Sequence, residues 1–516
     1  MALKPCGANA RCHVEAPSGP TLASLAAAAG GVLLGDASTV ITGISVDPQL
    51  RDMQPGALFA PLDLAPARAA ALAARAVERG AAAVLLDADP GMPVPRLIVP
   101  ALRPALAQVA AAFWGQPAVA LACIGVTGTA GKTTTTLLLD AILRRAGRRP
   151  GLIGTLEWRA GETWVRHESG MTTPEAPQVQ RLLRQIVDAG DRWAVIEASS
   201  QGLAQHRLDG VPFRIGAITC LTRAHLDFHG SVAAYHVAKG LLFAQVAANE
   251  GVAVLNADDP AVRALASDAG ERRLWYSASG APADVRATDV APGAGGTRFT
   301  LTLRGERAPV TLAQPGAWNV ANALCAAAIA HAAGLPLAQI VAGLEQAPPM
   351  PGLLAMVNAG QPFAVVIDEA KSPLALVQAL EFARQCAPQG RVIAVVAANG
   401  ANPGVLAQTG HVAALAADFT VFTAQRRTWV APAEILRQLT AGARAGEAAP
   451  KRDVACIGDR RDAIAHALGL ARPGDCVLLA GKGSDRADPA GGAGIWDEAA
   501  VARGILRELG YGERAG

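Results

Sequence analysis

Runs of apolar residues, separated by turns that contain glycine or proline, recur along the whole chain and predict buried strands. In the first region, up to about residue 112, such runs occur at Val40–Val46, Ala82–Leu86 and Leu97–Val99, between alanine-rich stretches with helical character. A longer run at Val119–Val126 leads through a glycine-rich turn into a helix expected at Thr133–Ala146. This strand–loop–helix order is typical of α/β domains.

Two further regions repeat the alternation of strand and helix. In the middle of the chain a helix is expected near Asn319–Ala333, and the proline-rich Gln346–Pro351 is expected to be a linker and a hinge. Ala281–Gly296 is expected to be an irregular surface loop or a hairpin. The pattern thus predicts an α/β fold with three domains, at residues 1–112, 113–348 and 349–516. The strands expected in the second and third domains are Trp193–Ile196, Ile215–Cys220, Val252–Leu255, Ala364–Ile367, Val392–Ala397, Phe419–Phe422 and Val477–Ala480.

Length, charge and cysteine content agree with this division and exclude several classes of protein. At roughly 150 residues per domain, 516 residues correspond to about three domains. The net charge of +3 is too small for a nucleic-acid-binding surface, and no apolar run is long enough to span a membrane. The eight cysteines are scattered without a Cys-x-x-Cys pair, which indicates reduced core thiols and a cytoplasmic rather than an exported protein.

Lysine is rare, and this draws attention to the positions where it is kept. Only six of the 46 cationic residues are lysine, and forty are arginine. Where arginine fills the ordinary surface role, a remaining lysine is a candidate for a task that needs an ammonium or a neutral amine, because arginine cannot be deprotonated. Lys4 and Lys451 have no motif around them, whereas Lys132, Lys239, Lys371 and Lys482 do.

The first of these motifs is a phosphate-binding loop, Gly125-Val-Thr-Gly-Thr-Ala-Gly-Lys-Thr-Thr134, which follows the strand and opens the helix. Its glycines allow close approach of the backbone, and the helix N-terminus supplies partial positive charge. Lys132 is expected to reach the terminal phosphates of ATP, and the Thr133 hydroxyl to ligate Mg²⁺. Five residues separate Gly125 from Gly131, instead of the usual four, so the loop is a variant. An incidental glycine-rich turn would not explain the Lys-Thr pair at the helix start.

Several motifs in a fixed order resemble those of the Mur ligases, which form amide bonds with ATP in peptidoglycan synthesis. Gly128-Thr-Ala-Gly-Lys-Thr-Thr134 is similar to the family's Gly-Thr-Asn-Gly-Lys-Thr-Thr loop, and the resemblance extends over nearly the whole chain. It is closest to the branch that adds the third amino acid to UDP-N-acetylmuramoyl-dipeptide. The further matching segments are Thr172-Thr-Pro174, Glu197–Leu203 with Arg207, His225–Gly230, Tyr235 with Ala238-Lys239, Leu255–Pro260, Asn319 with Asn322, Asp459–Ile464 and Ala480–Gly483.

The resemblance implies a smaller N-terminal α/β domain that binds a UDP-linked substrate, a central P-loop ATPase domain with a mostly parallel sheet, and a C-terminal Rossmann-like domain that binds the amine. It also implies transfer of the γ-phosphoryl group of ATP to a carboxylate, followed by attack of an amine on the acyl phosphate. Two Mg²⁺ sites are implied, and Lys239 is expected to be carbamylated so that it can serve as an anionic ligand.

The implied roles fall on particular residues of this chain. The catalytic residues are Lys132, Lys239, His225, Arg207 and Lys371. The nucleotide would contact Gly128, Thr129, Gly131, Lys132, Thr133, Thr134, Asn319, Asn322 and Arg460. The metal ligands are Thr133, Glu197, His225 and Lys239. Substrate contacts are expected from Thr172, Thr173, Ser199, Ser200, Arg207, Asp368, Lys482 and Asp485. For Asn319 and Asn322 the alternative is simple helix capping.

The sequence departs from the family at both substrate ends. Ser45-Val-Asp-Pro-Gln49 stands for Ser-x-Asp-Ser-Arg, and Asp63-Leu-Ala-Pro-Ala-Arg-Ala replaces an Asp-Gly-His-Asp-like loop. Asp368-Glu-Ala-Lys-Ser-Pro373 replaces Asp-Tyr-Ala-His-x-Pro. Gln425-Arg-Arg-Thr428 stands where an Asp-Asn-Pro-Arg motif selects diaminopimelate, so the arginine that would pair with an amino-acid carboxylate is absent.

Three hypotheses remain. The leading one is an active carboxylate–amine ligase with a non-standard substrate pair, acting as a monomer on small molecules and without nucleic acid or membrane partners. The second is a wall ligase that adds the third residue to UDP-N-acetylmuramoyl-dipeptide. The third is a catalytically silent nucleotide-binding paralogue, which retention of Lys132, Thr133, Glu197, His225 and Lys239 disfavours.

Overall fold

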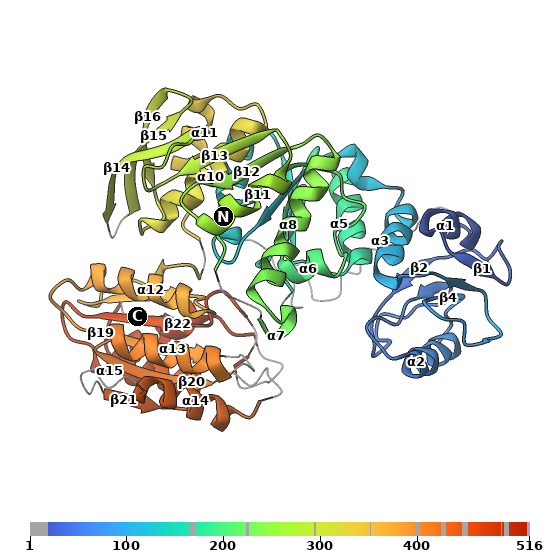
Figure 1. The fold of residues 1–516 in the computed structure, drawn as a ribbon. Coiled ribbons are helices and arrows are strands. Elements are labelled where there is room, and N and C mark those ends of the chain that lie inside the picture. The colour runs from blue at the N-terminus through green and yellow to red at the C-terminus, as the bar shows by residue number, and fades with distance from the viewer. Residues whose placement is uncertain are drawn as a thin grey trace. The chain divides into compact units, whose positions relative to one another are not determined.

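Three β-sheets, each flanked by helices, form the described part of the chain (Figure 1). The structure is a computed structural model, and it describes residues 19–165, 171–222, 226–293, 296–350, 352–398, 403–424, 430–445, 453–486, 488–489 and 495–512. The sheets have five, eleven and six strands in chain order, so the predicted α/β fold with three sheet-based regions is confirmed. Among these residues, no helix has the length and apolar character needed to cross a membrane.

The N-terminal sheet has the strand order β1-β5-β4-β3-β2, and only the β1–β5 pair is antiparallel. Alternation along β3 shows why it has two covered faces. Leu58 packs with α1 and α3, whereas its neighbour Phe59 packs with α2 on the other face. The elements are α1 (Leu22–Ala29), β1 (Val32–Leu34), β2 (Gly43–Ser45), β3 (Ala57–Phe59), α2 (Pro66–Glu78), β4 (Ala83–Leu86), β5 (Arg96–Ile98) and α3 (Leu102–Phe113).

This sheet belongs to a compact unit that includes more than the N-terminal segment. Residues 174–190, which contain α5 (Ala176–Asp188), and residues 202–211 cluster with it. The division at residues 112 and 348 stays a prediction, because the compact units follow proximity in space rather than sequence order.

The central sheet has a parallel core and antiparallel edges, in the order β16-β15-β14-β13-β12-β11-β6-β10-β7-β8-β9. Helices α4, α10 and α11 share one hydrophobic core with the sheet, and α8 covers strands β11 and β12 in another. The strands are β6 (Ala122–Thr127), β7 (Pro150–Ile153), β8 (Trp158–Ala160), β9 (Thr163–Val165), β10 (Trp193–Glu197), β11 (Phe213–Ile218), β12 (Val252–Asn256), β13 (Arg273–Ser277), β14 (Val285–Gly293), β15 (Gly296–Leu303) and β16 (Glu306–Leu312). The helices include α4 (Lys132–Arg145), α6 (Ser200–Ala204), α7 (Leu226–His229), α8 (Val232–Ala248), α9 (Pro260–Leu265), α10 (Trp318–Ala332) and α11 (Leu337–Glu345).

One expectation for this region needs correction, and one open alternative is decided. The strand expected from Val119 begins only at Ala122, because Pro117–Ala120 forms a 3₁₀ turn that leaves Val119 exposed. At Ala281–Gly296 the hairpin alternative holds, since β14 and β15 pair antiparallel there, with residues 294–295 outside the described part. The irregular-loop alternative is wrong for Val285–Gly293, because these residues form strand β14. Only the first residues of this strand alternate between buried and exposed positions.

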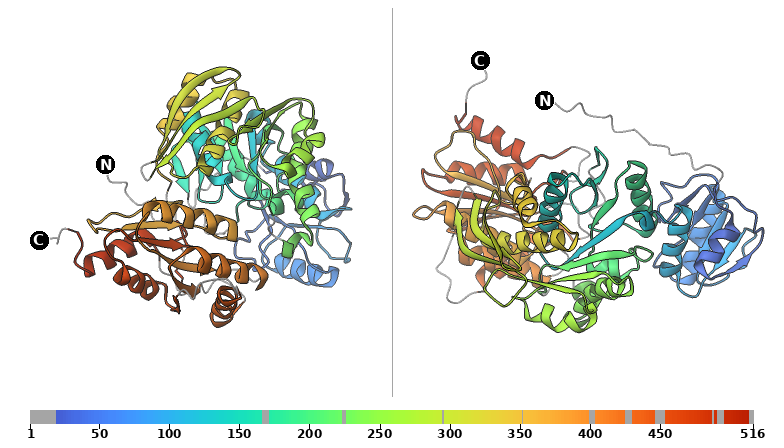
Figure 2. Two further views of the ribbon diagram at one scale, coloured as in Figure 1. Left: turned by 60° about the vertical axis from the view of Figure 1, so that its left-hand side comes forward. Right: turned by 90° about the horizontal axis from the view of Figure 1, so that it is seen from above.

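The C-terminal sheet has the order β17-β18-β22-β19-β20-β21 and is parallel except for β17. The sheet and its helices form the orange to red part of the ribbon in both views of Figure 2. Strand β22 returns between β18 and β19, and α12–α14 pack on one face while α15 and α16 pack on the other. The carboxyl ends of β18 and β22 therefore flank a topological switch point, where Rossmann-like sheets bind ligands. The elements are β17 (Ala355–Met356), β18 (Ala364–Asp368), α12 (Pro373–Cys386), β19 (Val392–Ala398), α13 (Pro403–Ala416), β20 (Phe419–Ala424), α14 (Pro432–Arg444), β21 (Asp453–Cys456), α15 (Arg460–Leu470), β22 (Cys476–Ala480) and α16 (Glu498–Glu508).

Candidate active site

The phosphate loop lies between the end of β6 and the start of α4, as the sequence predicts. Gly128 and Gly131 both adopt positive φ, at +141° and +81°. A Cβ at Gly131 would lie 2.2 Å from the Asn322 side-chain oxygen, and one at Gly128 would lie 1.8 Å from the Thr219 hydroxyl. Only glycine fits these two positions. Asn322 and Thr219 therefore brace the loop from two directions.

Two lysine side chains donate to the same backbone carbonyl in this loop. Lys132 Nζ lies 2.8 Å from the Gly128 oxygen, and Lys239 Nζ lies 2.9 Å from it. Lys239 is 1% exposed, and its pKa is held well below the ordinary value by burial and then by the nearby charge of Lys132. Burial also lowers the pKa of Lys132, against the opposing attraction of Glu197. The surroundings of Lys239 thus favour a neutral amine, which is the form that reacts with CO₂.

Oxygen-bearing side chains that could bind a metal ion lie beside the loop, at the end of β10. The Thr133 hydroxyl donates to Glu197 at 3.0 Å, and Thr155 donates to the same carboxylate from its amide at 3.0 Å and its hydroxyl at 2.8 Å. Burial raises the pKa of Glu197, opposed first by the Thr155 amide and then by Lys132. Thr155 was not predicted from the sequence; its signal is its place just after β7, the parallel neighbour of β10.

The predicted Thr172–Thr173 pair is joined to this cluster. Thr173 donates from its hydroxyl to the Glu197 carbonyl at 2.7 Å and accepts from the Ser199 amide at 2.9 Å. The Thr172 hydroxyl lies 3.1 Å from that of Thr155. The segment that resembles the family's substrate side is therefore anchored at the strand end that carries Glu197.

The donor set fits Mg²⁺ in its chemistry. A hydroxyl and a carboxylate are hard oxygen ligands, and Mg²⁺ usually completes its shell with water and substrate phosphates. In the described part of the chain no group of three or more His, Cys, Asp and Glu side chains is assembled for a metal, so an all-protein cage is not seen there. The predicted ligand His225 lies outside the described residues.

Residues of α6, α7 and α8 also connect to the loop. Tyr235, on α8, is buried, and its hydroxyl lies 3.0 Å from that of Thr129. Its ring centroid lies 4.8 Å from Lys239 Nζ. The ring of His229 contacts that of Tyr235, and its Nε2 lies 3.0 Å from the Ser200 hydroxyl. Ser200 is thus linked through His229 and Tyr235 to Thr129 of the phosphate loop. Thr134 lies in the first turn of α4.

Asn319 and Asn322 lie in the first turns of α10, but neither is its N-cap, which is Ala317. Asn322 donates to the side-chain oxygen of Asn319 at 2.9 Å, and Asn319 donates to the Pro315 carbonyl at 2.7 Å. Helix capping therefore does not explain the pair. Contact of Asn322 with Gly131 puts it next to the phosphate loop, and the nucleotide contact stays a prediction.

At the switch point of the C-terminal sheet, Asp368 is the last residue of β18, and Lys482 follows the end of the paired strand β22. Asp368 accepts the amides of Leu354 at 2.9 Å and Ala370 at 2.8 Å, and burial raises its pKa to about 7. Lys482 is fully buried, 3.4 Å from an Asp485 oxygen. Lys371 is partly exposed and pairs with Glu369 at 2.5 Å. The two residues that replace the family's tyrosine and histidine thus pair with each other.

The contacts of Arg460 differ from those expected of a nucleotide-binding residue. It is 2% exposed, donates to the Ala480 carbonyl at 3.2 Å and forms a buried ion pair with Glu498. These contacts join α15 to α16 and to the end of β22. They favour a structural role, and the predicted nucleotide contact of Arg460 is not supported by any of them.

Arg207 lies in the compact N-terminal unit, whereas the phosphate loop belongs to the other compact unit. It is 9% exposed and lies 3.0 Å from a Glu175 oxygen and 2.6 Å from the Gln205 side-chain oxygen. Burial lowers its pKa, and Glu175 opposes that effect. Glu175 was not predicted as a site residue, although it directly follows the Thr-Thr-Pro motif.

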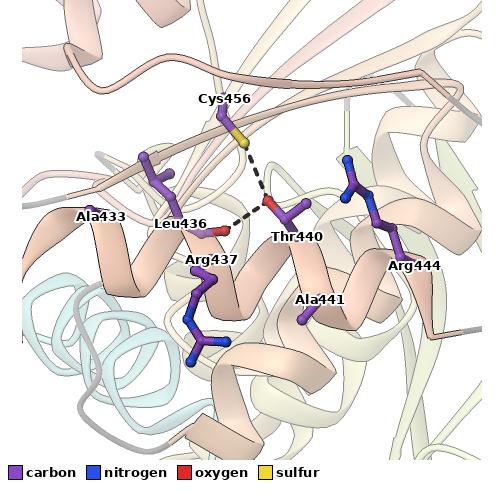
Figure 3. Close-up of a pocket in the computed structure, with 7 residues that line it drawn as sticks. All are labelled: Ala433, Leu436, Arg437, Thr440, Ala441, Arg444 and Cys456. Atoms are coloured by element: carbon purple, nitrogen blue, oxygen red, sulfur yellow. Dashed lines mark hydrogen bonds between the residues drawn. The ribbon is translucent and has the colours of Figure 1, made fainter.

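A surface pocket on α14 lies outside all of these groups (Figure 3). It is lined by Ala433, Leu436, Arg437, Thr440, Ala441, Arg444 and Cys456. None of the predicted site residues is among them. Cys456 is exposed, with its sulfur 3.3 Å from the Thr440 hydroxyl, so the expectation of core thiols is wrong for this cysteine; Cys123, Cys325 and Cys476 are buried as expected.

A phosphate loop, the half-buried Lys132 and the buried Lys239 beside it, and a Rossmann-like C-terminal sheet define a nucleotide-dependent enzyme. Comparison with known proteins gives its class. Residues 126–330 match the Mur ligase middle domain, and residues 354–483 match the Mur ligase glutamate ligase domain. The chain belongs to the Mur ligase family. It is therefore an ATP-dependent ligase that joins an acid to an amino acid, as predicted from the motifs.

Relatives and solved structures agree with this assignment over most of the chain. The chain is 40% identical to a UDP-N-acetylmuramyl-tripeptide synthetase of Roseiflexus, over 92% of this chain and 96% of the relative. It is 36% identical to a UDP-N-acetylmuramoyl-L-alanyl-D-glutamate–2,6-diaminopimelate ligase of Geobacillus kaustophilus, over 85% and 89%. A solved diaminopimelate ligase of the same description matches with a TM-score of 0.63 and 26% identity, over 92% of this chain and 97% of that one.

Proposed function

We propose that this protein adds the third amino acid to UDP-N-acetylmuramoyl-dipeptide, with ATP as the energy source and through an acyl phosphate. The relatives with 35–40% identity are named for this step. They favour it over the expected non-standard substrate pair outside wall synthesis. The observation that carries the catalytic part is the meeting of Lys132, Lys239, Thr133 and Glu197 around the phosphate loop.

Each of these residues has a task that follows from its surroundings. Lys132, which folds back onto the Gly128 carbonyl, would turn to the β- and γ-phosphates of ATP. The amides of the loop and the N-terminus of α4 would hold the phosphates. Arg207 would bind an anionic group of the carboxylate substrate. Lys132 and the loop amides would help to neutralise the charge that develops during phosphoryl transfer.

Thr133 and Glu197 would hold Mg²⁺, and Lys239, once carbamylated, would provide a further anionic oxygen ligand. When bound, the metal supplies positive charge to the phosphate oxygens. Burial of Lys239 favours the neutral amine that carbamylation needs, and Arg at this position could not take that form. The Thr172–Thr173 segment and Ser199 would position the substrate carboxylate.

The amine site is assigned to the switch point of the C-terminal sheet. Lys371, Lys482 and Asp485 supply both signs of charge there, and Asp368 adds a buried carboxyl group, which suits a zwitterionic amino acid. Diaminopimelate is named for several relatives, but the segment expected to select it, residues 425–428, departs from the family pattern and lies outside the described residues. The identity of the amino acid therefore depends on an assay.

The test is release of ADP that depends on both substrates. We expect purified protein with ATP, Mg²⁺ and UDP-N-acetylmuramoyl-L-alanyl-D-glutamate to release ADP when one amino acid of a panel is added, diaminopimelate and lysine included. Mass spectrometry should then find the UDP-linked tripeptide. Amine-dependent turnover with free carboxylates alone would restore the non-standard pair, and no turnover with any pair would indicate a silent nucleotide-binding protein.

A further inference from the structure

A chain of alternating charges leads away from Arg207 inside the N-terminal compact unit. Glu175 lies between two arginines: one of its carboxylate oxygens is 3.0 Å from Arg207 Nη2, and the other is 3.0 Å from Arg103 Nη1. Arg103 also donates through Nε to Asp63 at 2.8 Å, and a second contact joins its Nη2 to the other Asp63 oxygen. All four residues belong to the same compact unit.

Arg103 lies at a position where its positive charge is unfavourable unless nearby carboxylates compensate for it. It lies in the first turn of α3, where the partial positive charge of the helix N-terminus disfavours a cation. Its side chain is 15% exposed, so burial also opposes its charge. Two carboxylates offset both effects, and the side chain thereby becomes fixed through the bidentate contact with Asp63.

Arg207 is fixed in a similar way from the opposite side. Its side chain is 10% exposed and contacts Glu175 and the Gln205 side chain. His206, which lies between Gln205 and Arg207 in the sequence, adopts a left-handed backbone conformation with φ of +57°. Its Nδ1 lies 2.8 Å from an Asp209 carboxylate oxygen. Gln205 itself offers its carbonyl to Arg103 at 3.4 Å. Arg103 and Arg207 therefore share two partners, Glu175 and Gln205.

Asp63 belongs to the segment that departs from the family pattern. It stands at the start of the Asp63–Ala69 segment and has a left-handed backbone, with φ of +56°. An aspartate tolerates this conformation better than most residues, at some cost in strain. In the segment that departs from the family pattern, Asp63 therefore holds the Arg103 side chain in place.

We propose that Arg103 is a positioning residue for Arg207, acting through Glu175, and that Asp63 keeps Arg103 in place. The inference rests on the proposed function, in which Arg207 binds an anionic group of the UDP-linked carboxylate substrate. Loss of Arg103 would leave Glu175 with Arg207 alone, so that the Arg207 guanidinium would be drawn to Glu175 and become less available to the substrate. Removing one member of a buried ionic group leaves its partner's charge uncompensated.

The test measures dissociation constants by calorimetry for UDP-N-acetylmuramoyl-L-alanyl-D-glutamate and, separately, for ATP with Mg²⁺. We expect Arg103→Met to weaken binding of the UDP-linked substrate about tenfold, a coupling typical of residues in one ionic network, and to leave the ATP constant within about twofold. In an Arg207→Met background, Arg103→Met should add no further loss. The non-additive result is the signature of an effect that acts through Arg207.

Arg96→Met is the matched control. Arg96 also makes a two-point ion pair in the same unit, with Asp89 at 2.6 and 3.0 Å, and its side chain is 17% exposed. Its ion pair is with Asp89 and not with Glu175, and we expect unchanged binding of both ligands. Arg103→Lys, which keeps the charge but loses the fork geometry, serves if Arg103→Met does not fold, as judged by thermal unfolding. It should weaken substrate binding without changing ATP binding.

Three results would overturn the proposal: equal weakening of both ligands, losses that add in the double variant, or no change in any of the variants. Failure of the proposed function looks different. In that case the wild-type protein itself would neither bind the UDP-linked dipeptide nor release ADP with it, whereas a wild-type protein that binds and turns over, with unaffected Arg103 variants, would reject only the positioning role.

Discussion

At the scale of single residues, the shared carbonyl of Gly128 gives a reason why positions 132 and 239 hold lysine and not arginine. Two ammonium groups bound to one oxygen repel each other, and burial adds to the cost of charge on Lys239. A guanidinium would stay charged under these conditions. The rarity of lysine in this chain is therefore informative at Lys132 and Lys239, where the amine must either move between partners or become neutral.

The first prediction concerns Lys239. Lys239→Ala should lower the rate of ADP release by about 100-fold, because an anionic ligand and its charge stabilisation are lost together. Added formate or acetate should restore part of the rate by occupying the vacated space. Lys239→Arg is the control, since it keeps a cation that cannot be carbamylated and leaves no space for the added anion. Full activity of Lys239→Ala without any added carboxylate would contradict the ligand role.

Asp368 gives a second prediction at this scale. Burial raises its pKa to about 7 in the folded protein, from 3.8 when unfolded. Between these values the folded state binds more protons than the unfolded state, so stability falls as pH rises from about 4 to 7 and then levels off. At 1.36 kcal/mol per unit, this contribution amounts to about 4 kcal/mol at most.

Urea unfolding of wild type and Asp368→Asn from pH 4 to 8 checks the sign. The variant cannot titrate at this position, so its free energy of unfolding should fall less steeply than that of wild type over this range. In Asp368→Asn, an NH₂ group replaces one carboxylate oxygen and faces a backbone N–H donor. This changes the free energy of unfolding by a similar amount at every pH and leaves its pH dependence unchanged. Parallel curves for the two proteins would contradict the raised pKa.

At the scale of elements, helices α13 and α14 approach each other through glycine. A Cβ at Gly410 would lie 1.9 Å from the Leu439 carbonyl oxygen, and one at Gly442 would lie 1.9 Å from that of Ala407. Both atoms are backbone, so neither helix can relieve the overlap by a side-chain rotation. The close contact of these helices depends on two positions where glycine is otherwise unfavourable in a helix.

We expect Gly410→Ala and Gly442→Ala each to lower the free energy of unfolding by about 1–3 kcal/mol, as overpacked cores do. Gly469, in α15, is the control, because a Cβ added there would meet no described atom within 4 Å. Gly469→Ala should raise stability by about 0.5–1 kcal/mol through helix propensity alone. Chemical unfolding measures all three, and equal effects at the three sites would contradict close packing of α13 on α14.

The sequence predicts elements well where apolar runs meet a turn, and less well where contacts decide the outcome. Strand β11, helix α10 and the phosphate loop follow from local pattern, because periodicity and glycine position are local properties. The 3₁₀ turn ahead of β6 depends on a left-handed Gln116, which no pattern signals. Thr155 and Glu175 join the site through strand order and helix packing, and these are visible only in the folded chain.

At the scale of the whole molecule, the fully buried residues of each sheet form their own hydrophobic clusters in the described part of the chain, and Trp318 of α10 is a half-buried residue that packs against the C-terminal one. The N-terminal sheet packs with α1–α3, the central sheet with α4, α8, α10 and α11, and the C-terminal sheet with α12–α16. Regions with their own cores can open separately, so a ligand protects chiefly the region that binds it. The site residues of the phosphate loop all belong to the central core region.

This separation predicts where a nucleotide changes hydrogen exchange. With Mg²⁺ and a non-hydrolysable ATP analogue at 100 times its dissociation constant, stabilisation is about 2.7 kcal/mol, which slows exchange through global opening of the central region about 100-fold. Protection should appear at residues 126–136 and 219–222, where the Thr129 amide donates to the Cys220 carbonyl at 2.8 Å. Strands β2–β4 should exchange unchanged. Lys132→Met should remove the protection, and uniform protection across all three sheets would show that the molecule opens as one unit instead.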